Sequence, residues 1–426
     1  MVKESRKSQF DSMMIDQYWN FGEKKELKMH SIHPYPAKFP AFIAEKAFEY
    51  AEREGVEVSK VADIFCGCGT VALESELHGK AFWGCDINPV ATLIARTKSQ
   101  EYNITSTQSF FDKIKDDYLK TDEVPEDYSN ANERIKYWFT ERSFNQLNKL
   151  KKSIENTVTE KHYNDAFLCL FSSVLKPSSK WLTKSIKPQV DPNKNEIDVF
   201  KAFELQFRRF MKAIEQLQTY GFNQKEIDIV DGNFLELTNI PSVDLIVSSP
   251  PYVTSYEYAD LHQLSSLWLN YATDYRELRK GSIGSMYGNK DYDPDKQNLN
   301  SIGKSIVSQL KDAGNANSKI QAIAHYYCDM QEAVKKCYQI LNKDGMVLFV
   351  VGDTEYKGVK ILNSEHLIMS LREEGFSDIK KASRKISNKI LTPYRDDKGK
   401  FTSDSKKRKV YHEEFVISAR KKEARL

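Results

Sequence analysis

The sequence predicts an α/β fold built on a doubly wound, mostly parallel sheet. Two βα units come first, because the apolar strands expected at 61–65 and 81–85 are each followed within a few residues by a helical pattern. Apolar strands return late in the chain, at 226–230, 243–248 and 346–351. Strands joined through helices pair in parallel, so these five segments are expected to form the centre of one sheet.

The other expected elements surround or extend this sheet. Apolar residues at helical spacing predict helices over 36–54, 71–78, 88–96, 256–271 and 320–341. The two closing segments, 376–386 and 413–418, have the apolar pattern of strands and are joined by a polar, basic stretch. We expect them to form an antiparallel hairpin at one edge of the sheet.

A long helical stretch interrupts the alternation of strands and helices. Between residues 100 and 223 the sequence shows helical periods at 134–158, 163–175 and 197–217, and no clear strand. A gap of this length inside one sheet is too long for a plain loop. We therefore expect three segments: the first part of an α/β domain at 1–99, an inserted helical subdomain at 100–224, and the second part of the α/β domain at 225–426, with a mobile loop at 279–300.

Composition excludes several classes of protein. The net charge of +3 predicts little about partners. No apolar run approaches the roughly 18–20 residues of a membrane span, and the N-terminus lacks the apolar core of a secretory signal. The six cysteines include no Cys-x-x-Cys pair, which favours a reducing cytoplasm over a disulfide framework or a structural zinc site. We expect a cytoplasmic protein with no metal site and no membrane partner.

The segment Ser249-Pro250-Pro251-Tyr252 is the strongest functional signal in the chain. It follows the strand expected at 243–248, and two prolines fix the backbone in a stiff, extended turn. Such a turn presents a hydroxyl, rigid carbonyl groups and an aromatic face at the end of a strand. These groups suit a planar base with an exocyclic amine, although a tight turn with a packed tyrosine has the same pattern.

A glycine turn after the first expected strand indicates a nucleotide cofactor. Gly67 and Gly69 let the backbone turn sharply and approach a ligand closely. The turn lacks the complete dinucleotide fingerprint, so a dinucleotide site stays open on this pattern alone. Asp86 ends the second expected strand, about 20 residues after the glycine turn, and a carboxylate at this separation in the sequence is typical of one that binds ribose hydroxyls. The alternative role for Asp86 is to cap the helix that begins near Asn88.

Taken in order, these segments resemble the S-adenosylmethionine-dependent amino-methyltransferases of DNA. The resemblance covers about two-thirds of the chain and is carried by residues 33–39, 63–70, 86–88, 231–233, 249–252 and 342–345. It assigns cofactor binding to Ala37, Lys38, Phe39, Asp63, Phe65, Cys66, Gly67, Gly69, Thr70, Asp86, Ile87, Asn88, Asp231, Gly232 and Asn233. It assigns catalysis to Ser249, Pro250, Pro251 and Tyr252.

The resemblance implies a Rossmann-like methyltransferase with a seven-stranded sheet and S-adenosylmethionine as cofactor. Its Ser-Pro-Pro-Tyr form is most associated with methylation of the N4 amine of a flipped cytosine in double-stranded DNA. Adenine N6 is the alternative target, because the family more often places Asp where Ser249 stands when the target is adenine. An RNA methyltransferase on the same fold and a non-catalytic DNA-binding protein stay open as well.

The resemblance also implies partners. Double-stranded DNA is the expected substrate, and a cognate restriction or defence protein is an expected partner. The insertion offers candidate DNA contacts at Arg142, Lys180, Trp181, Lys184 and Lys187, since basic and aromatic residues together are typical of DNA-contacting loops. An ordinary solvated loop would have the same composition.

Overall fold

The structure is a computed structural model of the 426-residue chain. It describes residues 16–20, 25–36, 38–120, 126–251, 253, 258–287, 298–385, 394–395, 401–402, 404, 408–409 and 413–422. Two predicted site residues, Ala37 and Tyr252, lie outside the described residues. Residues 288–297 of the loop predicted at 279–300 also lie outside them.

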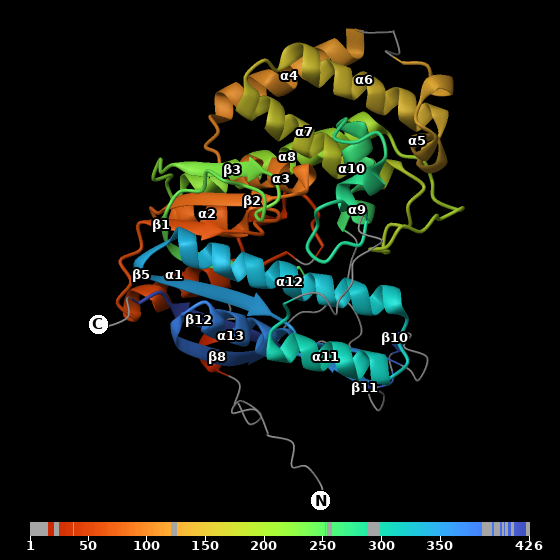
Figure 1. The fold of residues 1–426 in the computed structure, drawn as a ribbon. Helices are drawn as coiled ribbons and strands as arrows, with labels where there is room; N and C mark the ends of the chain where they lie inside the picture. Colours follow the sequence, from red (N-terminus) through yellow and green to blue (C-terminus); the bar gives the residue numbers. More distant parts are fainter. Residues whose placement is uncertain are drawn as a thin grey trace, which may run out of the picture.

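A seven-stranded sheet forms the centre of the molecule and confirms the predicted fold class (Figure 1). Its strands, in spatial order, are β3 (Ile227–Asp231), β2 (Ala81–Asp86), β1 (Lys60–Asp63), β4 (Val243–Ser248), β5 (Leu341–Val351), β12 (Glu413–Arg420) and β8 (Ser377–Lys385). The first five are parallel to one another. β12 is antiparallel to both β5 and β8, so the closing pair forms the predicted antiparallel edge.

Helices cover both faces of the sheet because its strands are apolar on both sides. Val61 and Leu245 point into one core, which helices α1 (Ala41–Arg53) and α2 (Thr70–Leu77) cover. Their neighbours in sequence point into the opposite core, where helices α11 (Ser301–Asp312), α12 (Asn317–Ile340) and α13 (Asn363–Glu373) pack. Successive residues of a strand face opposite sides, so buried residues without alternation mark a doubly covered sheet.

The insertion is a layer of helices whose apolar core also includes neighbouring helices. It contains α4 (Ile104–Lys120), α5 (Glu133–Trp138), α6 (Glu141–Thr157), α7 (Lys161–Ser178) and α8 (Val199–Gln218). These helices share a third apolar core with α3 (Pro89–Lys98) and α10 (Gln263–Trp268), and they lie above the sheet in Figure 1. The insertion therefore packs on both the cofactor half and the catalytic half of the chain.

Several predicted helices have different bounds. The helix predicted at 36–54 begins at Ala41, because Pro40 is extended and a residue before a proline avoids the helical region. The helix predicted at 134–158 is two helices, since Thr140 caps α6 by accepting a hydrogen bond from the Ser143 N–H. The helix predicted over 256–271 is α9 (Tyr258–Leu261) followed by α10.

The sequence prediction missed α4, α11 and α13 and several short elements. The short elements are η1 (Gln17–Trp19), η2 (Lys28–Ser31), η3 (Tyr128–Asn130), η4 (Tyr275–Arg279), β6 (Thr354–Tyr356), β7 (Val359–Ile361), β9 (Tyr394–Arg395), β10 (Phe401–Thr402) and β11 (Arg408–Lys409). All six cysteines are free thiols. Among the described helices, none has the length and apolar character needed to cross a membrane.

Candidate cofactor and catalytic site

Four neighbouring strands end in polar side chains at one edge of the sheet. Asp63 ends β1, Asp86 ends β2, Asp231 ends β3 and Ser248 ends β4, and these strands are parallel neighbours. β1 pairs on one side with β2, the next strand in the chain, and on its other side with β4. Ligands of doubly wound sheets bind outside the carboxyl ends of the strands, where the strand order reverses. The candidate site lies at that position.

A cleft at this edge brings most of the predicted site residues together. Those that line it are Lys38, Phe39, Asp63, Phe65, Cys66, Gly67, Thr70, Asp86, Ile87, Asn88, Gly232, Asn233, Ser249, Pro250 and Pro251. Gly69 and Asp231 are described but do not line it. The cleft is therefore shared by the predicted cofactor residues and the predicted catalytic turn.

The two glycines of the turn have different roles. Gly67 has a φ of +48° and lines the cleft, so it brings the backbone close to the ligand position. Gly69, with a φ of +72°, is the residue that precedes α2. A Cβ atom at Gly69 would lie 2.5 Å from the Cβ of Ala95 on α3. Gly69 therefore allows α2 and α3 to pack closely, and its effect on a ligand is indirect.

Asp86 is held in place with its carboxylate toward the cleft. Its two oxygens accept hydrogen bonds from the N–H groups of Gly67, at 2.9 Å, and of Asn88, at 2.8 Å. Loss of solvent at the cleft floor raises the pKa of Asp86 to about 6. Asn88 caps α3 through its own side chain, so the helix does not use the Asp86 carboxylate as its side-chain cap.

Asp63 joins the cofactor turn to the catalytic strand. Its Oδ1 atom accepts a hydrogen bond from the Ser248 hydroxyl at 2.6 Å and another from the Phe65 N–H at 3.1 Å. The residue is 3% exposed, and burial raises the pKa of Asp63 to about 7. The ends of β1 and β4 are thus fixed to each other next to the predicted catalytic turn.

Asp231, predicted to bind the cofactor, pairs with side chains of helix α3. Its Oδ1 atom accepts hydrogen bonds from the Thr92 hydroxyl and from Arg96, whose Nη1 atom lies at 3.0 Å. The carboxylate is therefore engaged by α3, and the residues of this turn that line the cleft are Gly232 and Asn233.

The catalytic turn leaves β4 toward the cleft. The Ser249 hydroxyl donates a hydrogen bond to the carbonyl oxygen of Val350 at 3.0 Å, so its hydrogen is used by the adjacent strand β5. The oxygen lone pairs of Ser249 can then accept a hydrogen bond from a ligand. Pro250 and Pro251 line the cleft beside it.

Sequence reasoning missed several residues of the cleft wall. They are Tyr35, Ile64, Cys68, Phe234, Ala259, Leu278, Gly281, Ser282 and Ile283, whereas Tyr258, which also lines the cleft, was expected from the sequence as a candidate for the base pocket. Tyr35 lies within a segment already assigned to the cofactor, and its ring stacks on His262 with centroids 5.0 Å apart. The segment 278–283 carried one signal in the sequence, Gly281, which has a left-handed φ.

The candidate DNA-contacting segment of the insertion is an ordered hairpin. Trp181 and Val190 form an antiparallel bridge, and the Leu182 N–H donates to the Gln189 carbonyl at 2.7 Å. Trp181 is 2% exposed and its ring stacks on Trp138, so the expectation that Trp181 contacts DNA is wrong. Its role is to anchor the hairpin. Lys184 and Lys187 are exposed between the two ends of the bridge.

The strand order, the glycine turn and the cleft at the switch point define a Rossmann-like methyltransferase. Residues 48–290, more than half of the chain, match the model of the D12 class N6 adenine-specific DNA methyltransferase family. The chain belongs to this family of DNA methyltransferases. S-adenosylmethionine is therefore its methyl donor.

Individual relatives are distant. The Type II methyltransferase M.MvaI of Kocuria varians is 25% identical over 403 residues, which cover 86% of each chain. Two solved structures also match. A SAM-dependent methyltransferase of Methanosarcina mazei matches with a TM-score of 0.31 and 10% identity, over 92% of this chain and 99% of that one. The rRNA methyltransferase aviRa of Streptomyces viridochromogenes matches with a TM-score of 0.29 and 8% identity, over 92% of this chain and 91% of that one. At such TM-scores neither bears on the fold, which follows from the strand order.

The cleft residues fit S-adenosylmethionine. Two buried polar atoms, Thr70 Oγ1 and Asn88 Nδ2, have no hydrogen-bond partner among the described residues. Both residues line the cleft, and buried polar groups are usually paired. Asp86 offers a carboxylate for the ribose, and Gly67 leaves space for close approach. These features suit a ligand with hydroxyl and amino groups, as S-adenosylmethionine has.

Proposed function

We propose that this DNA methyltransferase modifies the exocyclic N4 amine of cytosine in double-stranded DNA. The observation that carries the proposal is Ser249, a neutral acceptor at the first position of the Ser-Pro-Pro-Tyr turn. A family member directed at adenine would more often have an aspartate there. The Ser249 hydroxyl and the Pro250 carbonyl are the acceptors proposed for the two hydrogens of the target amine.

Methyl transfer to the amine depends more on hydrogen-bond acceptors around that amine than on a general base. S-adenosylmethionine supplies a methyl group already activated on a sulfonium. The amine of cytosine is conjugated with its ring, so its nitrogen must become more tetrahedral before it can attack. Positive charge develops on the amine as it does so, and fixed acceptors stabilise that charge. Because the Ser249 hydrogen is held by Val350, the hydroxyl oxygen is oriented as an acceptor before a base arrives.

The target base must leave the duplex to reach this turn. Enzymes that modify a base extrude it from the stack into a pocket, where aromatic side chains hold it. We propose that Tyr252 stacks on the flipped base, as expected from the sequence. Tyr252 lies outside the described residues, so this role rests on its place in the turn.

Adenine N6 is the second candidate target. The family model that matches the chain is described as N6 adenine-specific, which favours adenine. Both amines are attached to aromatic rings and require the same kind of acceptors. The choice between them depends on the pocket around the flipped base.

Mass spectrometry of nucleosides decides between the two bases. The purified protein is incubated with unmethylated bacterial DNA and labelled S-adenosylmethionine, and the DNA is digested to nucleosides. Labelled N4-methyldeoxycytidine is the expected product, whereas labelled N6-methyldeoxyadenosine alone would overturn the cytosine assignment. The Ser249→Ala variant is expected to lower the rate of transfer roughly 100-fold, by analogy with the loss of one oriented hydrogen-bonding group. Its affinity for S-adenosylmethionine should be unchanged.

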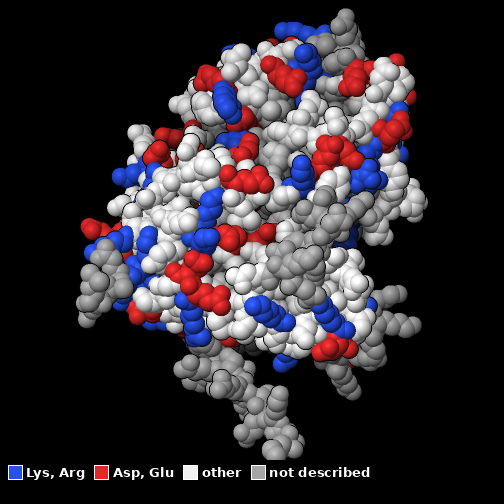
Figure 2. Space-filling model, viewed as in Figure 1, with Lys and Arg blue, Asp and Glu red and all other residues white. Residues whose placement is uncertain are grey.

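We also propose that the insertion contacts DNA through the hairpin that Trp181 anchors. Lys184 and Lys187 are exposed there, and no acidic residue lies between residues 181 and 190. On the face seen in Figure 2, described acidic and basic side chains are interspersed, so local loops of this kind are better candidates than a whole charged face. A cognate restriction or defence protein stays a prediction, which the similarity to a Type II methyltransferase of Kocuria supports.

A further inference from the structure

Two segments of the cleft wall follow the predicted catalytic turn in the chain and lie outside the sheet. One is Tyr258 and Ala259, at the start of α9, and the other spans residues 278–283, which we call the strap. Both segments lie in the chain after the catalytic turn. Their positions relative to the sheet therefore depend on side-chain contacts, because no strand pairing fixes them.

One ion pair joins the two wall segments. The carboxylate Oδ1 of Asp260 accepts hydrogen bonds from Arg279 Nη2 at 2.6 Å and from Arg279 Nε at 3.2 Å. Asp260 directly follows Ala259, and Arg279 directly follows Leu278. Each side chain is 27% exposed, so solvent screens the pair less than a fully exposed pair.

The far end of the strap is held by α12. The N–H of Gly284 donates to Asp329 Oδ2 at 2.7 Å, and Nδ1 of His325 donates to the carbonyl oxygen of Ser285 at 3.0 Å. Within the strap, a Cβ atom at Gly281 would lie 3.1 Å from Cδ1 of Ile87, the residue after the ribose carboxylate. The strap therefore packs against the cofactor half of the cleft.

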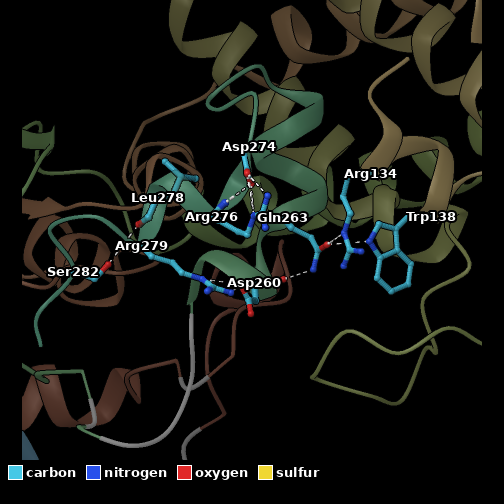
Figure 3. A network of polar contacts seen from close by, with 9 residues as sticks. All are labelled: Arg134, Trp138, Asp260, Gln263, Asp274, Arg276, Leu278, Arg279 and Ser282. Carbon is cyan, nitrogen blue, oxygen red and sulfur yellow. Dashed lines mark hydrogen bonds and ion pairs between the residues drawn. The ribbon is translucent and has the colours of Figure 1, made fainter. Parts of the chain in front are cut away.

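The ion pair is also connected to the insertion. Gln263, which is fully buried, donates from Nε2 to the carbonyl oxygen of Asp260 at 2.7 Å. Its Oε1 atom accepts from Arg134 Nε at 2.7 Å and from Trp138 Nε1 at 2.9 Å. Figure 3 shows Asp260 between Gln263 and Arg279, with Arg134 and Trp138 beyond Gln263. Helix α5 of the insertion thus fixes the position of Asp260.

We propose that Asp260 and Arg279 are positioning residues that hold the strap against the bound cofactor. The inference rests on the methyltransferase function only for the identity of the ligand. Neutralising either residue frees the strap at its N-terminal end and leaves the contacts to α12 in place. Cofactor affinity then falls, because part of the binding energy is spent on ordering the strap.

A double-mutant cycle tests the proposal. Asp260→Asn and Arg279→Gln are each expected to weaken the binding of S-adenosylhomocysteine about tenfold, measured by calorimetry without DNA. The double variant is expected to lose no more than either single variant, because both changes break the same pair. Losses that multiply in the double variant would overturn the assignment, since they would show that the two residues act independently.

A neighbouring ion pair provides a matched control. Arg276 and Asp274 also form an Asp–Arg pair at 2.6 Å, in the same stretch of chain, but neither residue lines the cleft. Asp274→Asn is expected to leave cofactor affinity unchanged. Equal losses in Asp260→Asn and Asp274→Asn would show a general effect on folding and would overturn the proposal.

Two further measurements separate the possible failures. If Asp260→Asn does not fold, Arg279→Lys keeps the charge but loses the two-nitrogen contact, and a loss of at least about threefold in cofactor affinity is expected; no loss would refute the inference. If the wild-type protein binds S-adenosylhomocysteine but methylates no base, the proposed function fails while the strap can still be tested. If it methylates normally and all pair variants bind normally, only the strap inference fails.

Discussion

The affinity for S-adenosylmethionine should depend on pH through Asp86. We propose that Asp86 accepts hydrogen bonds from both ribose hydroxyls, which requires an ionised carboxylate, and its pKa in the free protein is about 6. It is then about nine-tenths ionised at pH 7 and about one-tenth ionised at pH 5. If only the ionised form binds, the dissociation constant rises about tenfold from pH 7 to pH 5.

The groups around Asp86 define the window of this measurement. Asp63 also titrates near this window, because burial, and to a smaller extent the Asp86 carboxylate, raises the pKa of Asp63 to about 7. Burial raises the pKa values of Tyr35 and Cys66, which stay neutral in this range. Both carboxyl pKa values lie above those of an unfolded chain. Their contribution to the stability of the free protein is therefore present below about pH 4 and is lost as the pH rises through 6 and 7.

Calorimetric titrations with S-adenosylhomocysteine between pH 5 and pH 7.5 provide the assay. Asp86→Asn should bind more weakly at pH 7 and show little of the pH dependence. Asp231→Asn is the matched control, because this carboxylate is bound to Arg96 and does not line the cleft. The charge of Asp231 is the smallest of the causes that set the pKa of Asp86, so its removal should move the profile only slightly, toward lower pH. The Asp231→Asn variant should keep most of the pH dependence of S-adenosylhomocysteine binding. A flat profile in the wild-type protein, or an unchanged slope in Asp86→Asn, would refute the role of Asp86.

Two other predictions concern stability and DNA binding. Gly69→Ala should lower the free energy of unfolding by about 2–5 kcal/mol, because the new side chain would strain a left-handed backbone and overpack the contact between α2 and α3. Chemical denaturation would measure this loss, with an unchanged dependence of the free energy of unfolding on denaturant concentration. Wild-type stability in that variant would contradict the close contact with α3. Replacing both Lys184 and Lys187 with Ala should weaken DNA binding and reduce the log–log salt slope by about 2 in fluorescence anisotropy. The same change at Lys115 and Lys120, on α4, should leave that slope unaltered.

The sheet and the cofactor edge were predictable because they depend on local patterns. Apolar strands ending in Asp63 and Asp86, with a glycine turn between them, specify a strand, a sharp turn and a helix without any long-range information. The predicted antiparallel edge also followed from apolar runs alone. The break between α5 and α6 at Phe139 and Thr140 was harder to predict from the sequence, because one capping residue, Thr140, separates two stretches of helical spacing.

The rest of the site depends on contacts between distant segments. Asp231, predicted from the sequence to bind the cofactor, ends strand β3, and Arg96 from helix α3 pairs with its carboxylate. Trp181 looked like a DNA contact, but the ring of Trp138 covers it. The strap lines the cleft because Asp260 and Arg279 meet across a turn, which no periodicity reveals.

The pairing of β1 with β4 has a consequence for how the enzyme is made. The hydrogen bond between Ser248 and Asp63 joins residues 185 positions apart, so the cofactor edge meets the catalytic strand only after the whole insertion has been synthesised. Contacts of such sequence separation form slowly. The core of the insertion has to wait as well, because Leu264, Leu267 and Trp268 of α10 belong to it and follow β4 in the chain. We therefore expect the insertion and the cleft to become complete together, late in synthesis. A chain interrupted ahead of β4 would lack both.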